Sequence, residues 1–407
     1  MASRPTDSEP RQGEGAPGTP LSSAAHVQDV AAAVLARLQE RRNSCLRYEV
    51  GDEIGKGGMG RVLRARDGDL HRDVAMKVIR ENVGDAQSSK PGVSPRSLRV
   101  ARFLEEAQVA GQLDHPGIVP VHELGLDESG RVYFTMKLVR GQDLSSVLEL
   151  ASRGEEGCSE ARAVGVLLKA CEAMAYAHDK QVIHRDLKPS NIRVGRFGEV
   201  YVMDWGLARV LGRPDARDLR VREANEPISQ PVESMREAAS MLHTMDGTPI
   251  GTPMFMSPEQ AMGRADRMGP QTDVYGIGAI LYRLLTGQPP YVSPFSAVDA
   301  LQVVRWIKEG SPTPVLELAP RATPELVAIC EKAMARDPSV RYADMSELAD
   351  ELRAFLENRV VRAYRTGPLV ELRMWVRRNR AVALAGSLAL LAAFADRKST
   401  RLNSSHT

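Results

Sequence analysis

The sequence has few cysteines and almost no excess charge, and both shortages limit what the protein can be. Its 407 residues contain four cysteines, which form no C-x-x-C pair and are too few for a disulfide framework. They are Cys45, Cys158, Cys171 and Cys330, and we expect reduced, buried thiols in a cytosolic domain. Lysine and arginine number 54 against 52 acidic residues, a net charge of +2. No overall basic field drives nonspecific nucleic-acid binding, so nucleic acid is not an expected partner.

Two further features are missing. No charged-then-apolar secretory signal opens the sequence, so we expect its first half to stay in the cytoplasm. No internal repeat of about 20 to 50 residues is present. Hydrophobic residues make up 43% and charged residues 26%, values close to globular averages that exclude a mainly disordered or collagen-like chain. The length allows either two domains or one large domain with tails.

Composition divides the chain into segments. Residues 1–26 are rich in Pro, Gly and Ser, which predicts a disordered tail. Residues 27–47 predict a short amphipathic helix and a linker. The apolar residues at helical spacing there are Val27, Val30, Val34 and Leu38. Between residues 48 and 356, apolar periods of about 2 and about 3.6 residues alternate, which predicts one continuous α+β domain.

A glycine-rich stretch, IGKGGMGRV, occupies residues 54–62. Glycine has no Cβ, so the backbone can approach phosphate oxygens and direct N–H groups at them. A dinucleotide-binding fold would require a helix inside the motif and an acidic residue about 20 positions later. Instead, a hairpin follows, and then the strand-like residues 73–79 carry Lys77. Such a lysine is usually an edge residue, but after a glycine loop it is a candidate phosphate clamp.

The second motif is HRDLKPSN at residues 184–191, and thirteen residues after Asn191 comes Asp204, followed by Trp205 and Gly206. An aspartate and an asparagine five positions apart on one loop can serve a substrate hydroxyl and a metal ion together. The later aspartate would complete the metal site. Oxygen ligands of this kind suit Mg²⁺, which keeps part of its water shell and bridges phosphates.

Taken in this order, the motifs resemble the eukaryotic-type (Hanks-type) serine/threonine protein kinases of bacteria over about 300 residues. The resemblance implies an α+β, bilobal protein kinase fold. A β-rich N-lobe with one key helix would cover about residues 48–139, and a mainly helical C-lobe about residues 140–356. It also implies ATP-dependent phosphorylation of Ser/Thr hydroxyls in protein substrates, with Mg²⁺ or Mn²⁺, in signal transduction. The preference for Ser/Thr over Tyr is likewise implied by the resemblance, in particular by Lys188, two residues after Asp186.

The resemblance also implies a nucleotide site. Lys77 would hold the α- and β-phosphates and pair with a helix glutamate, for which Glu106 is preferred and Glu105 is the alternative. Met136 would be the gatekeeper of a hinge that reads the adenine. The residues implied for nucleotide binding are Ile54, Gly55, Lys56, Gly57, Gly58, Met59, Gly60, Val62, Ala75, Lys77, Glu106, Met136 and Leu138.

The same resemblance implies the catalytic and metal-binding residues. Asp186 would accept the hydroxyl proton, and Lys188 would neutralise charge on the transferred phosphoryl group. Asn191 and Asp204 would bind the metal. Because every catalytic position is present, the resemblance favours an active enzyme over a pseudokinase.

Three other positions have implied structural roles. Glu259 would pair with Arg341 near the end of the domain, and the buried Asp273 would fix the backbone of the catalytic loop. None of them is expected to contact the reacting groups.

The sequence departs from the family pattern at three places. Trp205 replaces a phenylalanine, a change expected to affect packing more than chemistry. Arg193 stands where an apolar side chain would lie under the adenine. Its stem or guanidinium could lie against the base, or a single-base sequencing error could account for it. An Arg193 that blocked productive ATP binding would make the chain a nucleotide-binding scaffold that signals by conformation, and this is the competing hypothesis.

The third departure is the long loop between Asp204 and Glu259. Its length and its prolines are typical of a mobile segment. Arg185 would pair with a phosphate on this loop, which implies activation by autophosphorylation. The available hydroxyls are Ser229, Ser234, Ser240, Thr244, Thr248 and Thr252, of which Thr244 and Thr248 are preferred.

The C-terminal end predicts a membrane anchor. Residues 357–380 are basic and precede the uncharged run of residues 381–395. Fifteen residues at about 1.5 Å each reach about 22 Å, short of the roughly 30 Å bilayer core, so we expect a partial transmembrane helix. A buried core helix is the alternative. Residues 396–407 resemble the translation of a sequencing-library adapter, and we expect the natural chain to continue.

These features predict a truncated single-pass receptor kinase whose kinase domain lies on the cytoplasmic face of the cell membrane. Membrane attachment would concentrate the domains and favour self-association, with phosphorylation between neighbours.

Reading the coding sequence beyond Ala395 tests the predicted anchor. We expect the apolar stretch to continue for about five or more residues and to be followed by a further domain. A stop codon or a polar continuation at that point would instead make residues 381–395 a packing helix.

Overall fold

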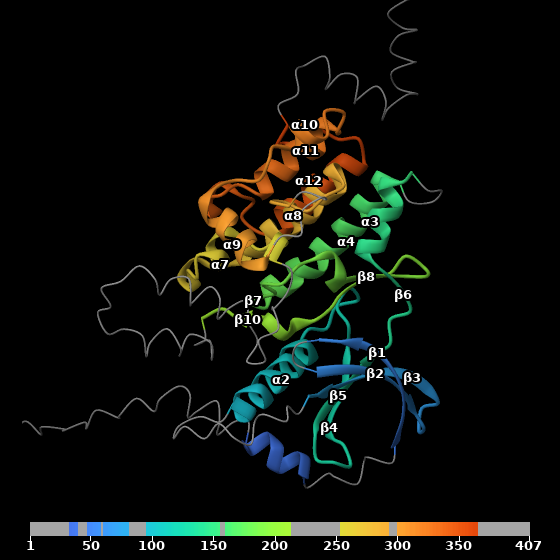
Figure 1. The fold of residues 1–407 in the computed structure, drawn as a ribbon. Coiled ribbons are helices and arrows are strands. Elements are labelled where there is room, and N and C mark those ends of the chain that lie inside the picture. The colour runs from blue at the N-terminus through green and yellow to red at the C-terminus, as the bar shows by residue number, and fades with distance from the viewer. Residues whose placement is uncertain are drawn as a thin grey trace, which may run out of the picture.

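The computed structural model describes residues 32–39, 47–57, 60–80, 95–154, 159–212, 253–292 and 299–364. Several predictions lie outside these ranges. They concern the tail of residues 1–26, the glycine-loop residues Gly58 and Met59, the loop hydroxyls Ser229, Ser234, Ser240, Thr244, Thr248 and Thr252, and the segments 365–380, 381–395 and 396–407. The described residues form two lobes, with the blue and teal strands in one and the yellow to orange helices in the other (Figure 1).

The N-lobe is built on a five-stranded antiparallel sheet of order β1-β2-β3-β5-β4. Its strands are β1 (Tyr48–Lys56), β2 (Gly60–Asp67), β3 (Arg72–Ile79), β4 (Val121–Leu126) and β5 (Val132–Lys137). One long helix, α2 (Pro95–Gln112), packs on this sheet. The α2 residues Phe103 and Leu104, and Ala107 one turn later, lie on a single face and share an apolar cluster with Phe134 of β5.

A second, shorter helix covers residues 32–39 and joins the same cluster. Its Leu38 is buried there, and Val34 and Leu35 pack against the cluster from the helix's apolar side. This helix lies beside α2 in Figure 1, on the outer part of the N-lobe.

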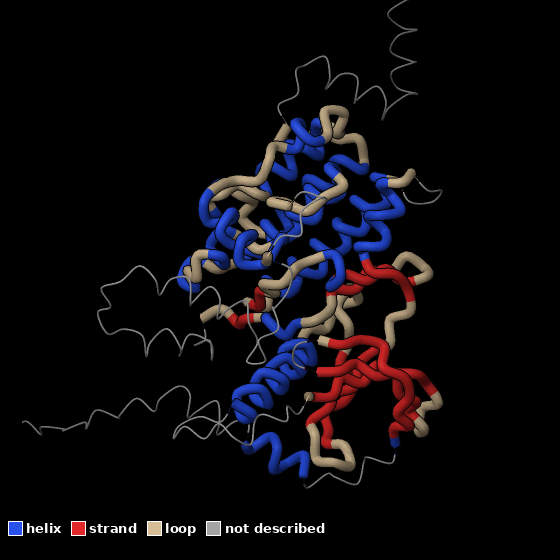
Figure 2. Tube along the Cα trace, in the orientation of Figure 1, coloured by secondary structure: helices blue, strands red, loops and turns tan. Residues whose placement is uncertain are grey.

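The C-lobe is mainly helical, as Figure 2 shows by colour. Its helices are α3 (Leu144–Ser152), α4 (Glu160–Asp179), α7 (Pro258–Ala261), α8 (Pro270–Thr286), α9 (Ala300–Glu309), α10 (Val315–Leu318), α11 (Pro324–Ala333) and α12 (Met345–Leu356). Short 3-10 turns are η2 (Pro189–Asn191), η3 (Trp205–Leu207), η4 (Pro253–Phe255), η5 (Ala265–Arg267) and η6 (Pro338–Val340). The side chains of Asp143, Ser159 and Asp344 cap the N-termini of α3, α4 and α12, respectively. Two lobes, one sheet-rich and one helical, confirm the predicted bilobal α+β fold.

Two small sheets lie where the C-lobe meets the N-lobe. Strands β6 (Gly141–Asp143), β8 (Ile192–Gly195) and β9 (Val200–Val202) pair in the order β6-β8-β9, and β7 (Val182–Ile183) pairs with β10 (Arg209–Val210). The predicted catalytic and metal-binding residues lie in the segments that directly follow β7 and β9.

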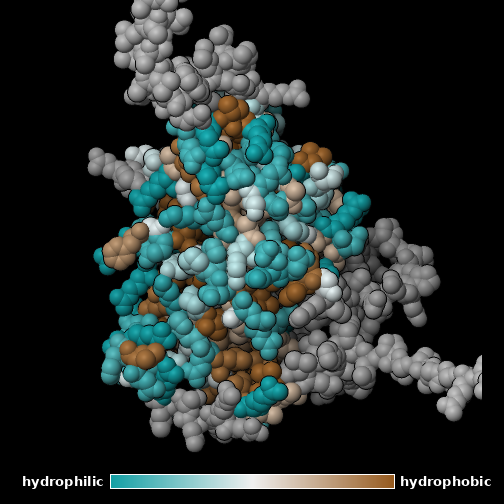
Figure 3. Space-filling model, turned by 180° about the vertical axis from the view of Figure 1, so that it is seen from behind, coloured by the Kyte–Doolittle hydropathy of each residue, from teal (hydrophilic) through white to brown (hydrophobic). Residues whose placement is uncertain are grey.

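The centre of the C-lobe is α8, which is buried along most of its length. Eleven consecutive residues, from Thr272 to Tyr282, are buried, so this helix is apolar nearly all round and carries the rest of the lobe. The core also contains Cys171 and Cys330, two of the four cysteines, which are free and buried as expected, and burial raises the pKa of both thiols. Cys45 and Cys158 lie outside the described residues. The surface seen from behind is mostly hydrophilic, with hydrophobic residues scattered between (Figure 3).

Packing of the C-lobe continues beyond residue 356, where the predicted domain ends. Val361 is fully buried, Tyr364 packs against the same core, and the backbone N of Ala363 donates to Oε2 of Glu351 at 3.1 Å. Within the described ranges, no helix has the length and apolar character needed to cross a bilayer.

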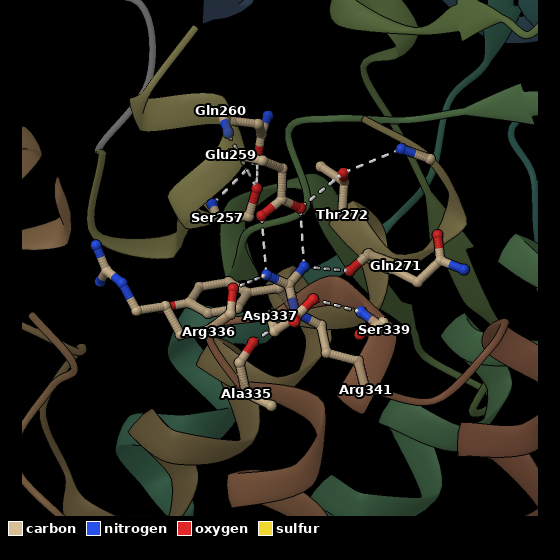
Figure 4. A network of polar contacts seen from close by, with 12 residues as sticks. Ser257, Glu259, Gln260, Gln271, Thr272, Ala335, Arg336, Asp337, Ser339 and Arg341 are labelled. Carbon is tan, nitrogen blue, oxygen red and sulfur yellow. Dashed lines mark hydrogen bonds and ion pairs between the residues drawn. The ribbon is translucent and has the colours of Figure 1, made fainter. Parts of the chain in front are cut away.

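A buried ion pair joins α7 to the segment that follows η6. The guanidinium of Arg341 meets both carboxylate oxygens of Glu259 at 2.8 Å, and both side chains are almost completely buried (Figure 4). The remaining N–H groups of Arg341 donate to the backbone oxygens of Ala335, Arg336 and Gln271. All five donors of the guanidinium are therefore used, which is the condition under which a buried ion pair is tolerated.

We predict that Arg341→Met destabilises the fold by about 3–5 kcal/mol, because it leaves the carboxylate of Glu259 buried and unpaired. Urea denaturation of the purified chain measures this loss. Arg305→Gln is the matched control, because it breaks the exposed Arg305–Glu309 pair on α9 and should leave the unfolding midpoint almost unchanged. Equal midpoints for the two variants would contradict the structural role of Arg341.

Candidate functional site

The glycine-rich stretch joins β1 to β2 in a tight hairpin. The backbone N of Gly57 donates to the oxygen of Gly60 at 2.9 Å. A Cβ on Gly60 would lie 2.5 Å from the backbone oxygen of Val78, so only glycine fits where β2 leaves the hairpin against β3. Gly55 pairs with Val62, and Val62 in turn pairs with Lys77 on β3. The hairpin therefore leads directly to the predicted lysine.

Lys77 is held between two carboxylates from different parts of the chain. Its Nζ lies 2.5 Å from Oε1 of Glu106 on α2 and 3.3 Å from Oδ1 of Asp204 in the C-lobe. Burial disfavours the ammonium, but the two acids outweigh it and hold the pKa of Lys77 above its usual value. The lysine pairs with Glu106, as preferred over the neighbouring Glu105.

The segment after β5 joins the lobes. Met136 pairs with Ala75 on β3 and with Val121 on β4, so it sits inside the N-lobe sheet. Lys137, the last residue of β5, donates from Nζ to the hydroxyl of Tyr201 on β9, and its ammonium lies 4.6 Å from the centre of that ring. No sequence motif predicted this contact between the lobes.

The loop before η2 is fixed by one buried carboxylate. Asp273 of α8 accepts the backbone N–H groups of His184 and Arg185, each at 2.8 Å, and meets Nε2 of His178 at 2.9 Å. Arg185 has a φ of 66°, a left-handed conformation that a non-glycine residue adopts only when its surroundings impose it. Although burial opposes ionisation, the bond from His178 and the nearby charges hold the pKa of Asp273 below its usual range.

His184 then links the two predicted catalytic segments. Its Nδ1 accepts from the backbone N of Asp186 at 3.2 Å, so its Nε2 carries the hydrogen and donates to the oxygen of Met203 at 2.9 Å. The ring of Trp205 packs on this imidazole with 4.8 Å between centroids. The tryptophan that departs from the family pattern is buried in this packing.

Asp186, Lys188 and Asn191 form one hydrogen-bonded group. Lys188 Nζ lies 2.7 Å from Oδ2 of Asp186, and Asn191 Nδ2 donates to the backbone oxygen of Asp186 at 2.8 Å and to its Oδ2 at 3.0 Å. Burial raises the pKa of Asp186, and the charge of Lys188 opposes that rise. The carboxylate is thus a stronger base than an exposed aspartate.

Asn191 and Asp204 have the properties of metal ligands. The amide N–H groups of Asn191 are turned to Asp186, which leaves its side-chain oxygen as the acceptor. Half of the Asp204 side chain is exposed, and the charge of Lys77 lowers the pKa of its carboxyl group. Two oxygen ligands fit Mg²⁺, which keeps several waters. The described residues contain no group of three His, Cys, Asp or Glu that would suit a metal held by protein alone.

Comparison with known proteins agrees with this geometry. Residues 48–352 match the family model described as protein kinase domain. Serine/threonine-protein kinase PknD of Protochlamydia amoebophila is 33% identical over 321 residues, which cover 77% of this chain and 30% of that protein. Serine/threonine-protein kinase PknD of Chlamydia trachomatis is 36% identical over 320 residues, covering 76% and 32%. PknB of Mycolicibacterium smegmatis, also a serine/threonine-protein kinase, is 34% identical over 309 residues, covering 75% and 42%. The chain thus spans less than half the length of these relatives.

We predict that Asp273→Asn loosens the loop of residues 184–191. An amide accepts fewer hydrogen bonds from the backbone N–H groups of this loop than a carboxylate does, and each such bond to a charged acceptor contributes about 1.5–3 kcal/mol. Hydrogen exchange at the amides of His184 and Arg185 should become faster. Because the pKa of Asp273 is lowered, its contribution to stability is present above the usual aspartate pKa and is lost as pH falls through the lowered one. Asp273→Asn should lack this part of the dependence of stability on pH.

Asp179→Asn is the control for this experiment, since Asp179 is exposed at the end of α4. Unchanged exchange at His184 and Arg185 in Asp273→Asn would show that the loop is held by other contacts.

Proposed function

The chain belongs to the protein kinase family, and from that premise we propose that it transfers the terminal phosphoryl group of ATP to serine and threonine hydroxyls of protein substrates in signal transduction. One observation carries the proposal. Asp186, Lys188 and Asn191 are joined by hydrogen bonds of 2.7–3.0 Å, and Lys77 reaches Asp204 from the other lobe at 3.3 Å. Groups for a hydroxyl, for phosphates and for a metal are thereby gathered at one place.

The proposed reaction uses these groups in one displacement. The substrate hydroxyl oxygen forms a bond to the γ-phosphorus as the bond from that phosphorus to the bridging oxygen of ADP breaks. Asp186 accepts the hydroxyl proton, for which its raised pKa suits it. Lys188 offsets negative charge on the transferred group. Mg²⁺, or Mn²⁺ in its place, held by Asn191 and Asp204, supplies charge neutralisation on the phosphates.

The nucleotide would lie under the glycine hairpin. Backbone N–H groups of Gly55, Gly57 and Gly60 would approach the phosphates, and Lys77 would hold the α- and β-phosphates. Residues proposed to border the base or the hairpin are Ile54, Lys56, Val62, Ala75, Met136 and Leu138. Glu106 acts by positioning Lys77. Gly58 and Met59 complete the proposed loop outside the described residues.

A nucleotide-binding scaffold is the competing reading. Labelled ATP, Mg²⁺ and a generic basic protein discriminate between the two, because a scaffold would bind the nucleotide without labelling the protein.

We further propose activation by phosphorylation between neighbouring copies, and attachment to a membrane through residues 381–395. Arg185 supports the first part, since its backbone oxygen accepts from Gln260 and its Nε donates to Leu207, which ties it to both ends of the long loop. A phosphate on that loop would bring a charge of about −1.5 to −2 to this arginine.

We predict that Asp186→Asn nearly abolishes phosphoryl transfer and leaves ATP binding largely intact. The reason is that the amide cannot accept the hydroxyl proton, while the groups proposed to hold the nucleotide are unchanged. Steady-state turnover and calorimetric ATP binding measure the two properties. Asp204→Ala is the comparison variant and should shift the Mg²⁺ titration as well. Near-parental turnover in Asp186→Asn would remove Asp186 from its proposed role.

Phosphosite mapping tests the proposed autophosphorylation. We expect phosphate at Thr244 or Thr248 in protein incubated with ATP, and none in Asp186→Asn treated in the same way. Active enzyme with no phosphate between Asp204 and Glu259 would contradict the proposal.

A further inference from the structure

The proposed reaction gives no role to Arg193, a charged residue of the small sheet β6-β8-β9. It is the second residue of β8, the central strand between β6 and β9. Ile192 and Val194 on either side are buried in the C-lobe core, so strand alternation places Arg193 on the opposite face. Its direct cross-strand neighbours, Asp143 and Tyr201, share that face.

This face looks toward the segment that joins the lobes. The hydroxyl of Tyr201 accepts from Lys137, which stands between Met136 and Leu138, the residues proposed to border the base. Two residues before Arg193, Asn191 bonds to Asp186. Arg193 therefore lies between the base-bordering segment and the catalytic loop.

One donor of the Arg193 guanidinium is unsatisfied at this position. Its Nε is buried and has no hydrogen-bond acceptor within the parts of the chain that the structure describes. Oδ1 of Asp143 already accepts from the backbone N and the hydroxyl of Ser146, both at 2.9 Å, and the hydroxyl of Tyr201 is engaged by Lys137. A buried donor without an acceptor is unfavourable, and arginine offers donors only. The Arg193 side chain as a whole is only partly buried, so an acceptor that a ligand brings to this face would bond the terminal N–H groups and offset the cost.

We propose that Arg193 is a nucleotide-contacting residue of this chain, whose guanidinium donates a hydrogen bond to an acceptor on the base or ribose of ATP. The inference rests on the proposed function for the identity of its ligand. An apolar side chain at residue 193 would contribute packing alone, whereas the arginine adds a hydrogen bond from a charged donor. On this view Arg193 assists nucleotide binding and does not obstruct it.

Calorimetric binding of adenosine tests the proposal without any need for turnover. Arg193→Leu keeps apolar bulk and removes the donors, so we expect adenosine and ADP to bind about tenfold more weakly, the effect of losing one charge-assisted hydrogen bond. Arg196→Leu is the matched control, because Arg196 is exposed on the turn directly after β8. It should leave adenosine and ADP binding nearly unchanged.

A second ligand locates the acceptor. If the loss caused by Arg193→Leu is much smaller for 2′-deoxyadenosine than for adenosine, the guanidinium contacts the ribose 2′-hydroxyl. If the loss is the same for both, it contacts the base or another ribose oxygen. Either result supports the proposal.

Equal or tighter adenosine binding in Arg193→Leu would overturn it, since the side chain would then lie away from the nucleotide or block it. Absence of measurable adenosine binding by the parent would overturn it as well. Thermal unfolding without ligand should show Arg193→Leu at or above the parent, because the unpaired donor is gone, and Arg193→Met serves if the leucine variant does not fold. A parent that binds adenosine through Arg193 but transfers no phosphate would defeat the proposed function alone.

Discussion

The carboxylate of Asp273 is the constraint on which the loop of residues 184–191, the proposed catalytic loop, depends. It lies in α8, the most deeply buried helix, and takes two backbone N–H groups from a loop that would otherwise have unpaired donors in the interior. These bonds hold Arg185 in a left-handed conformation, and the loop then turns Asp186 back toward Lys188 and Asn191. The geometry of the site is therefore set from within the C-lobe core.

A second connection runs between the lobes. Glu106 on α2, Lys77 on β3 and Asp204 before η3 form a chain of alternating charge in which each member stabilises the next. Any shift of α2 away from the sheet would leave a buried charge uncompensated, which is strongly unfavourable. The position of α2 is thus coupled through electrostatics to Asp204, the proposed metal ligand, and the apolar cluster beneath α2 contributes the packing that keeps it there.

The sequence predicted those parts of the structure that are encoded by residues close together in the chain. The glycine hairpin, the strand of Lys77 and the catalytic loop are local motifs, so their spacing specifies them. Glu105 and Glu106 are adjacent and alike in chemistry, so the residues alone left both as candidate partners of Lys77. The resemblance favoured Glu106. The contacts His178–Asp273 and Lys137–Tyr201 join residues 95 and 64 positions apart and arise only from packing. His178 among the buried residues of α4 was a usable signal, because a buried histidine requires a partner. The sequence did not predict the burial of Val361, because the nearby arginines indicated a basic segment outside the domain.

The packing of the C-lobe end also sets the length that the proposed membrane tether would have. Tyr364 still lies against the core, and sixteen residues, 365–380, separate it from the uncharged run that begins at Ala381. Sixteen residues can extend no farther than about 55 Å. A domain attached to a bilayer by such a tether would be confined to a layer of that depth. The frequency with which two tethered copies meet would then depend on their density in the membrane plane and hardly at all on their concentration in the cell volume.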